Sequence, residues 1–295
     1  MIGRKALGGP SLPQPVRNVY VWVNRNVGRL DPLPRVLPNF YLIGTQRGGS
    51  TSLFIYLLGH ELVHGPRRAK GVHYFDTNFT QSLDWYRGNF PRLSFIEQQI
   101  ADHGVPPAIG EGAPYYMFHP AIAERIHEVT PKARMIVVLR EPLDRAISHH
   151  NHEVARGFER LDVIDAFEAE EPRLHGEEQR LLDDPHYVSK AHIHHSYLSR
   201  GRYAPQLQRY YDLFGASNVL VLDSAKLRAE PEATVRRATE FLGLPPIIGG
   251  EYPKYNQRDH DPVDAELRAR YGPVFEESNE QLRSMLEPGD LSWLD

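Results

Sequence analysis

The chain has 295 residues, a formal net charge of −4 and no cysteine, and its 41% hydrophobic and 24% charged residues are typical of a globular protein with a core. The acidic balance argues against a nucleic-acid partner, and the lack of cysteine excludes disulfides and cysteine-bound metals. No apolar run approaches the roughly 20 residues of a transmembrane segment, and no secretory signal is evident, so we expect a cytoplasmic protein.

The predicted elements alternate between strands and helices. Residues 1–38, rich in Gly, Pro and Arg, are predicted to form an irregular arm whose stretch 19–27 packs on a single domain at 39–295. Short apolar runs predict buried strands at 40–43, 72–75, 108–111, 135–139 and 219–222. Helical patterns lie at 51–58, 120–129, 142–156, 163–171, 205–214, 232–242 and 265–285. This order predicts an α/β fold with a mostly parallel central sheet flanked by helices, with ligands at the carboxyl ends of the strands.

The turn after the first strand is the most informative segment. A strand, a small-residue loop and a helix start present backbone N–H groups to a phosphate. Gly44 and Gly49 keep the GxxxxG spacing of a Walker A loop, but Ser50 stands where that motif has lysine. The alternative is an ordinary strand-to-helix turn with a capping Ser or Thr. The residues predicted to bind phosphate are Arg47, Gly48, Gly49, Ser50, Thr51 and Ser52.

A second candidate anion site follows the strand at 135–139. Arg140 comes directly after the strand, Pro142 suits a first helical turn, and Ser148 lies about two turns along. If the helix runs back beside the strand end, Arg140 and Ser148 can share an anion. The alternative is that Arg140 pairs with Glu141 or Asp144 and that Ser148 is a surface serine.

Together these segments resemble the sulfotransferase family that uses 3′-phosphoadenosine-5′-phosphosulfate (PAPS), in particular its carbohydrate, heparan-sulfate-like branch and bacterial relatives. The resemblance covers roughly residues 39–285. Its further landmarks are Lys70-Gly-Val-His-Tyr-Phe-Asp76, Trp85-Tyr-Arg87, Phe90-Pro91, Glu111-Gly-Ala-Pro-Tyr115, Arg200-Gly-Arg-Tyr-Ala-Pro-Gln-Leu207 and Glu240-Phe-Leu-Gly-Leu244.

The resemblance implies a P-loop-like fold and transfer of a sulfuryl group from PAPS to a hydroxyl or amine, with 3′,5′-ADP (PAP) as product and no metal. Arg47 and the glycine-rich loop would bind the 5′-phosphosulfate, and Arg140 with Ser148 the 3′-phosphate. Arg200, Gly201 and Arg202 would reach the 3′-phosphate or the adenosine, unless they form a plain basic turn. The segment Asn256-Gln257-Arg258 lies where relatives close a loop over the nucleotide.

The resemblance leaves the general base open. Relatives carry a glutamate base where Gly71 stands and a lysine where Gly112 stands. His73 is our first candidate, since an unperturbed imidazole titrates near pH 6.5; on a strand it would share a face with Phe75. Lys70 and Glu111 are further catalytic candidates. The alternatives are a hydrogen-bonded histidine at a strand end and a solvated lysine.

A histidine-rich helix face supplies the candidates for acceptor binding, His149, His152 and Glu153. Their spacing differs from that of a zinc-binding helix, so we expect no metal; a plain polar face is the alternative. The acceptor itself stays open between a saccharide, a glycolipid, a lipid and a small metabolite. Two other functions also stay open: a P-loop kinase or NTPase, and a catalytically impaired protein that only binds PAPS or PAP.

Overall fold

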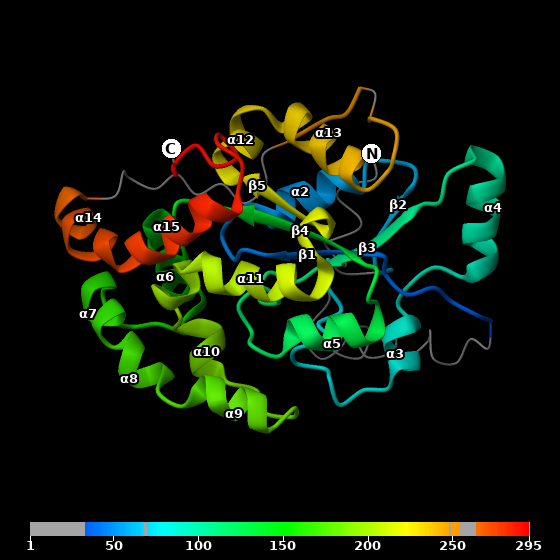
Figure 1. Ribbon diagram of the computed structural model, residues 1–295. Helices are drawn as coiled ribbons and strands as arrows, with labels where there is room; N and C mark the ends of the chain where they lie inside the picture. The colour runs from blue at the N-terminus through cyan, green and yellow to red at the C-terminus, as the bar shows by residue number, and fades with distance from the viewer. Residues whose placement is uncertain (1–32, 68–69, 248, 254–263, 295) are drawn as a thin grey trace.

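The computed structural model describes residues 33–67, 70–247, 249–253 and 264–294. The predicted arm up to residue 32 and Asn256-Gln257-Arg258 lie outside these ranges. A five-stranded parallel sheet with the order β2-β3-β1-β4-β5 forms the centre (Figure 1). This arrangement confirms the predicted α/β fold. The strands are β1 (Phe40–Gly44), β2 (Val63–His64), β3 (Ala108–Gly112), β4 (Arg134–Leu139) and β5 (Val219–Asp223).

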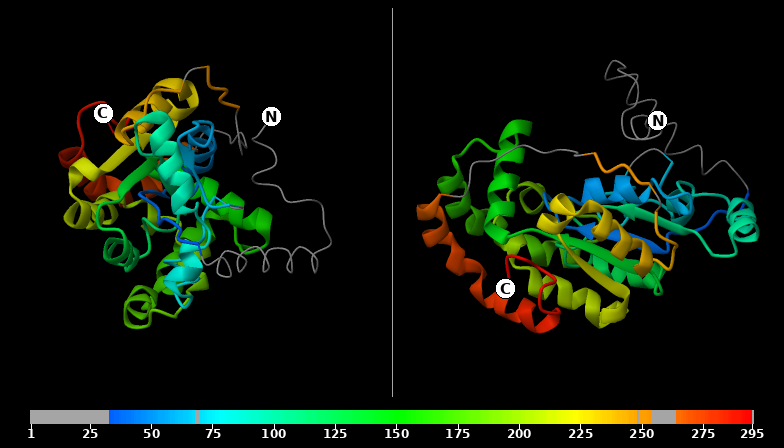
Figure 2. Two further views of the ribbon diagram at one scale, coloured as in Figure 1. Left: turned by 90° about the vertical axis from the view of Figure 1, so that its right-hand side faces the viewer. Right: turned by 90° about the horizontal axis from the view of Figure 1, so that it is seen from above.

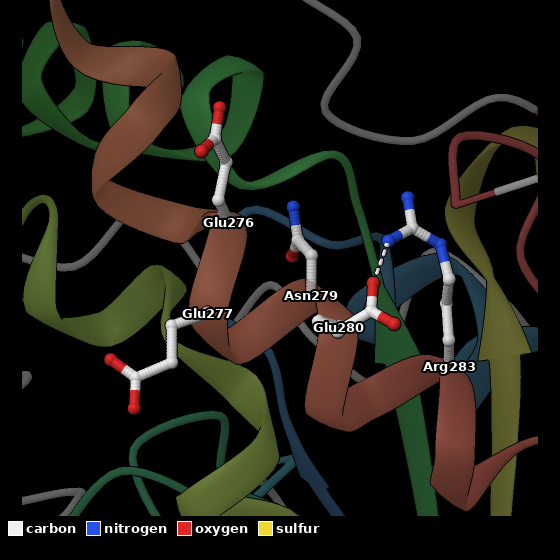
Figure 3. A pocket seen from close by; sticks show the side chains of 5 residues that line it. All are labelled: Glu276, Glu277, Asn279, Glu280 and Arg283. Atoms are coloured by element: carbon white, nitrogen blue, oxygen red, sulfur yellow. Dashed lines mark hydrogen bonds and ion pairs between the residues drawn. The ribbon is translucent and has the colours of Figure 1, made fainter.

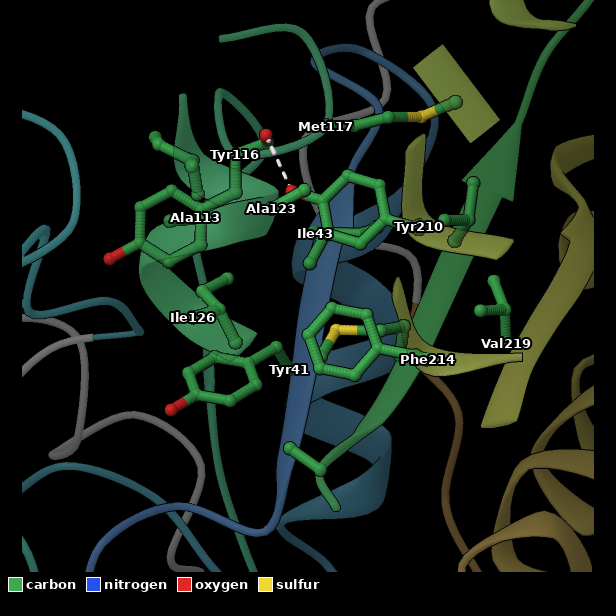
Figure 4. Packing of buried hydrophobic residues seen from close by; sticks show 14 of the residues in the cluster. Tyr41, Ile43, Ala113, Tyr116, Met117, Ala123, Ile126, Tyr210, Phe214 and Val219 are labelled. Carbon is green, nitrogen blue, oxygen red and sulfur yellow. Dashed lines mark hydrogen bonds between the residues drawn. The ribbon is translucent and has the colours of Figure 1, made fainter. Parts of the chain in front are cut away.

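Helices cover both faces of the sheet because successive side chains of a strand point to opposite faces. Phe40 and Leu42 of β1 pack toward α2 (Ser50–Leu57), α12 (Ser224–Ala229) and α13 (Pro231–Phe241). Tyr41 and Ile43 pack toward α5 (Ile122–Val129), α11 (Tyr203–Phe214) and α15 (Glu276–Met285). Figure 4 shows this second layer, where Tyr210 and Phe214 of α11 lie against β1 and β4.

A third, smaller apolar cluster joins α6 (Pro142–Arg156) to α7 (Val163–Glu168) and α14 (Ala265–Tyr271). In Figure 1 these helices form a group beside one end of the sheet, while α4 lies at the other end, and Figure 2 agrees from above. The remaining helices are α3 (Leu83–Arg87), α4 (Leu93–His103), α8 (Glu170–Leu174), α9 (Glu177–Asp183) and α10 (Lys190–His194), with short 3-10 turns at Ser199–Gly201, Ala216–Asn218 and Gly272–Phe275.

One predicted strand is wrong. Residues 72 and 73 are irregular and 74 and 75 form a turn, because side chains occupy the backbone groups that a neighbouring strand would need. Glu111 accepts from Val72 N, and Asn78 donates to the carbonyls of Val72 and His73. His73 also adopts a left-handed backbone with φ of 57°. Val72, Tyr74 and Phe75 are all buried, so the strand-like alternation of faces does not hold here.

The other four predicted strands are confirmed to within one or two residues. The helix predicted over 265–285 is divided by a 3-10 turn at Gly272-Pro273, and that over 163–171 is divided into α7 and the start of α8. In the described ranges, no helix has both the length and the apolar character that a bilayer crossing requires.

Candidate active site

The loop between β1 and α2 lies where the strand order changes direction, with β3 on one side and β4 on the other. Thr45 ties the loop to the end of β4, because its N–H and its Oγ1 both donate to Val138 O, at 2.9 and 3.1 Å. Gly48 packs on the same carbonyl so closely that a Cβ would lie 2.4 Å from it. Gly49 caps α2 with φ of 102°, a conformation that favours glycine.

The loop places Arg47 against the helix after β4. Arg47 Nε donates to Ser148 Oγ at 3.1 Å, and Ser148 is buried. Arg47 therefore contacts α6 at Ser148, and its charge also acts on Arg140, the residue that follows β4. The Glu141 carboxylate caps α6 through Leu143 N and Asp144 N. The two segments predicted to bind phosphate thus meet in one place.

Arg140 is a half-buried cation at the centre of this region. Its Nε is buried and, within the described residues, has no hydrogen-bond partner. The carboxylates of Glu141 and Asp144 both pair with Arg268 instead. Burial lowers the pKa of Arg140, and the nearby Arg228 and Arg47 lower it further against the opposing effect of Asp144. A bound anion would stabilise this excess of positive charge.

Arg228 is a residue that the sequence reasoning missed. Its guanidinium donates to Ser224 Oγ at 3.1 Å, and Ser224 follows β5 at the same edge of the sheet. Ser224 Oγ also lies close to Gly49 of the loop. Arg228 does not follow a strand directly, because it lies in α12, so the rule that identified Arg140 does not identify it.

The segment 70–76 brings a second set of candidates to the loop. Lys70 Nζ donates to Ser50 Oγ at 2.8 Å and lies 3.4 Å from Thr51 Oγ1. His73 Nδ1 lies 2.8 Å from Asp76 Oδ2, with the imidazole 41% exposed and the carboxylate buried. A carboxylate oxygen accepts a hydrogen bond, so His73 Nδ1 is assigned as the donor to Asp76. Asp76, part of the motif quoted above, is thus the partner that orients His73.

Glu111 occupies a different environment from the one its catalytic assignment would need. It is fully buried in β3 and accepts hydrogen bonds from Val72 N, Tyr86 OH and Tyr116 OH. Burial raises the pKa of this carboxyl, against the effect of these donors. In this structure Glu111 holds the segment 70–76 in place and does not face solvent.

Arg200 is predicted to reach the nucleotide, whereas the structure places it inside the protein. Its side chain is 1% exposed and donates to Gln46 Oε1 and to the carbonyls of His192 and Ile193. Gln46 Nε2 in turn donates to the buried Glu153, at 3.3 Å. Gln46 belongs to the loop between β1 and α2, so Arg200 and Glu153 hold this loop from the side of the protein interior.

The acceptor-binding candidates on α6 differ in how far they are buried. His149 and Glu153 are fully buried, and His152 is half-buried. Burial lowers the pKa of His149 well below its usual value, so the ring is neutral. Burial opposes ionisation of Glu153, but His149 and His194 beside it lower its pKa to about 2.

The two neighbours of Arg200 that are predicted to reach the nucleotide lie in different surroundings. Gly201 packs between Phe275 and Pro142, and Arg202 is exposed.

Arg200→Ala should lower the free energy of unfolding by about 3 kcal/mol, because Gln46 and two carbonyls lose a buried charged donor. Urea unfolding would measure this, with the exposed neighbour Arg202→Ala as control at less than about 0.5 kcal/mol. Equal, small effects of the two changes would show that the buried contacts of Arg200 do not stabilise the fold.

A surface depression elsewhere contributes nothing to this region. It lies along α15 and is lined by Glu276, Glu277, Asn279, Glu280 and Arg283, with Arg283 paired to Glu280 (Figure 3). Its lining comes from one helix and includes none of the predicted site residues. Within the described residues, no three His, Asp or Glu side chains come together as ligands for a metal ion.

Residues 37–252 match the family described as "Sulfotransferase domain", and the chain belongs to this family. The membrane-associated sulfotransferase kil1 of Dictyostelium discoideum is 24% identical, over 87% of this chain and 66% of its own length. Heparan sulfate glucosamine 3-O-sulfotransferase 5 of Homo sapiens is 27% identical, over 75% of this chain and 57% of its own length. The chain therefore spans only part of each relative.

A solved structure bears out the fold. The crystal structure of a sulfotransferase from Alicyclobacillus acidocaldarius superposes with a TM-score of 0.61 at 24% identity, covering 85% of this chain and 96% of that one. The α/β fold predicted from the strand order and the loop is thus the sulfotransferase fold.

Proposed function

We propose that the protein transfers a sulfuryl group from PAPS to a hydroxyl or amine of a carbohydrate, a glycolipid or a small metabolite. The observation that carries the proposal is the environment of Arg140. Its buried Nε has no hydrogen-bond partner among the residues that the structure describes, the charge of Arg47 acts on it, and such a group is costly unless an anion completes it. Arg140 follows β4, whereas the loop hydroxyls follow β1, so Arg140 suits a second phosphate such as the 3′-phosphate.

The residues present fit the nucleotide. Arg140 and Ser148 would hold the 3′-phosphate, while Arg47 and residues 48–52 would hold the 5′-phosphosulfate at the start of α2. When bound, the donor supplies an activated sulfuryl group: its sulfur–oxygen bond to the 5′-phosphate breaks, a sulfur–oxygen or sulfur–nitrogen bond to the acceptor forms, and the released electron pair leaves with PAP. Arg47, a permanent cation, would stabilise the charge that develops on the leaving phosphate.

His73 is the proposed general base. Asp76 accepts from Nδ1 and orients the ring, so Nε2 is the nitrogen that would take the proton of the acceptor hydroxyl or amine. The left-handed backbone at His73 is a strained conformation for a residue other than glycine, and such conformations are concentrated at functional sites. Glu111 is not proposed as the base, because three hydrogen bonds already occupy its buried carboxylate.

A carbohydrate is the acceptor we favour, because the human relative is named for a heparan sulfate glucosamine. Incubation with ³⁵S-labelled PAPS and a panel of desulfated glycosaminoglycans, glycolipids and small alcohols tests the function. Labelled product from one acceptor class is the expected result. Tight PAP binding with no transfer to any acceptor would favour the alternative of a protein that only binds the nucleotide.

A further inference from the structure

Gly71 and Gly112 leave the space through which the Lys70 side chain reaches the loop between β1 and α2. We call this space the path. The Lys70 side chain crosses Gly112 at the end of β3, where a Cβ would lie 2.5 Å from Lys70 Cε and 3.1 Å from its Cγ. The backbones are joined as well, because Gly112 N donates to Lys70 O at 2.7 Å. The ammonium then reaches Ser50 Oγ and Thr51 Oγ1 in the first turn of α2.

Gly71 is the second part of the path. A Cβ at position 71 would lie 2.6 Å from Gly112 O, which is a backbone atom and cannot move aside easily. Only a glycine at 71 lets residues 70–72 lie this close to β3. The absence of a side chain at both positions therefore has one structural consequence: it brings the amine of Lys70 to the loop.

The ammonium has an unbalanced charge in this position. Burial lowers the pKa of Lys70 to about 7. Within the ranges that the structure describes, no carboxylate pairs with it, and its hydrogen-bond partners are the two neutral hydroxyls. The N-terminus of α2 adds further positive potential. An anion bound at the loop would relieve this charge and keep the lysine protonated.

We propose that Lys70 is a catalytic residue that contacts the sulfonate oxygens of the bound donor, and that Gly71 and Gly112 serve to deliver it there. This assignment rests on the proposed function. The ammonium would stabilise negative charge on the transferring group and on the oxygen that leaves with the nucleotide. It requires no new co-reactant, since the lysine forms and breaks no covalent bond.

The test compares two nucleotides that differ only by the sulfuryl group. The dissociation constants of PAPS and PAP are measured by isothermal titration calorimetry, without acceptor, for the wild type and for Lys70→Met, which keeps an unbranched side chain one atom shorter and removes the charge. We expect the affinity for PAPS to fall about 10-fold to 100-fold and that for PAP to change less than about threefold. The exposed Lys132→Met, at the other edge of the sheet, is the control and should change neither.

A rescue variant tests the path itself. In Lys70→Ala/Gly112→Lys the new side chain starts where Lys70 now lies, so it should restore at least part of the preference for PAPS that Lys70→Ala loses. Equal loss of both nucleotides in Lys70→Met, or no loss, would overturn the role of Lys70 and leave the proposed function intact. If the double variant did not restore any preference for PAPS, the claim that Gly71 and Gly112 position the Lys70 amine would be wrong. A wild type that binds neither nucleotide would instead contradict the proposed function, and the role of Lys70 with it.

Discussion

Replacing Arg140 by alanine should weaken the binding of 3′,5′-ADP by about 100-fold, equivalent to about 2.7 kcal/mol. The guanidinium is half-buried and its Nε has no hydrogen-bond partner in the described part of the chain, so a phosphate would gain a charge-assisted hydrogen bond in a partly desolvated place. The affinity for 5′-AMP, which lacks the 3′-phosphate, should stay within about threefold. Calorimetric titration of both nucleotides measures the effect.

Two controls make this result specific. Arg236→Ala removes an exposed arginine that pairs with Glu240 on α13, and it should leave both affinities unchanged. Arg228→Ala removes a neighbouring cation and should weaken both nucleotides to a similar, smaller extent. If Arg140→Ala affected 5′-AMP as strongly as 3′,5′-ADP, Arg140 would not be the site of the 3′-phosphate.

The His73→Asn change should lower the turnover of an identified acceptor by about 10²-fold to 10⁴-fold, because it removes the general base. Asparagine is chosen because it tolerates the left-handed backbone of residue 73, so the loss would not come from a distorted turn. The affinity for 3′,5′-ADP should be unchanged. Measurement of initial rates at saturating PAPS, together with nucleotide titration, separates the two effects.

A second variant tests the role of Asp76 in orienting His73. Asp76→Asn can still hydrogen-bond the ring but no longer requires the proton to be on Nδ1, so the rate should fall while the fold is kept. The exposed His186→Asn serves as the control and should keep the full rate. A His73→Asn variant with the wild-type rate would exclude His73 as the base.

The phosphate loop and the strands beside it could be predicted because their signals are local. Apolar runs closed by a glycine or an arginine identify β1 and β4, and parallel strands bring their carboxyl ends to one edge. Arg47 and Ser148, about a hundred residues apart, are therefore in contact, and Ser148 is the residue that the sequence pairs with Arg140 as a candidate anion site. The helix predicted over 142–156, with Pro142 in its first turn, has these bounds in the structure, where Gly157 caps its end.

The segment 70–76 could not be predicted in the same way. Its composition favours a strand, but side chains distant in sequence, chiefly Glu111, take the backbone hydrogen bonds of Val72 and His73. Tertiary contacts thus override local preference. The same contacts turn Gly71 and Gly112, which the sequence shows only as missing functional groups, into neighbours that direct Lys70.

Arg200 is a second case in which the sequence did not predict the position of a side chain. A basic residue in a Gly-containing turn predicts a ligand contact, but the burial of its guanidinium depends on packing between Tyr115 and Phe118 and on the loop residue Gln46. None of these partners is near it in sequence. Long side chains that reach across the fold cannot be assigned from spacing alone, whereas residues that directly follow a strand can.

The most direct test of a nucleotide site built around Arg140 is titration of the wild-type protein with 3′,5′-ADP and, separately, with ATP and Mg²⁺. We predict that 3′,5′-ADP binds at least about 100-fold more tightly than ATP, because the second phosphate must reach Arg140 and Ser148 and the loop has serine where a Walker motif has lysine. Tight binding of ATP without measurable binding of 3′,5′-ADP would contradict the account.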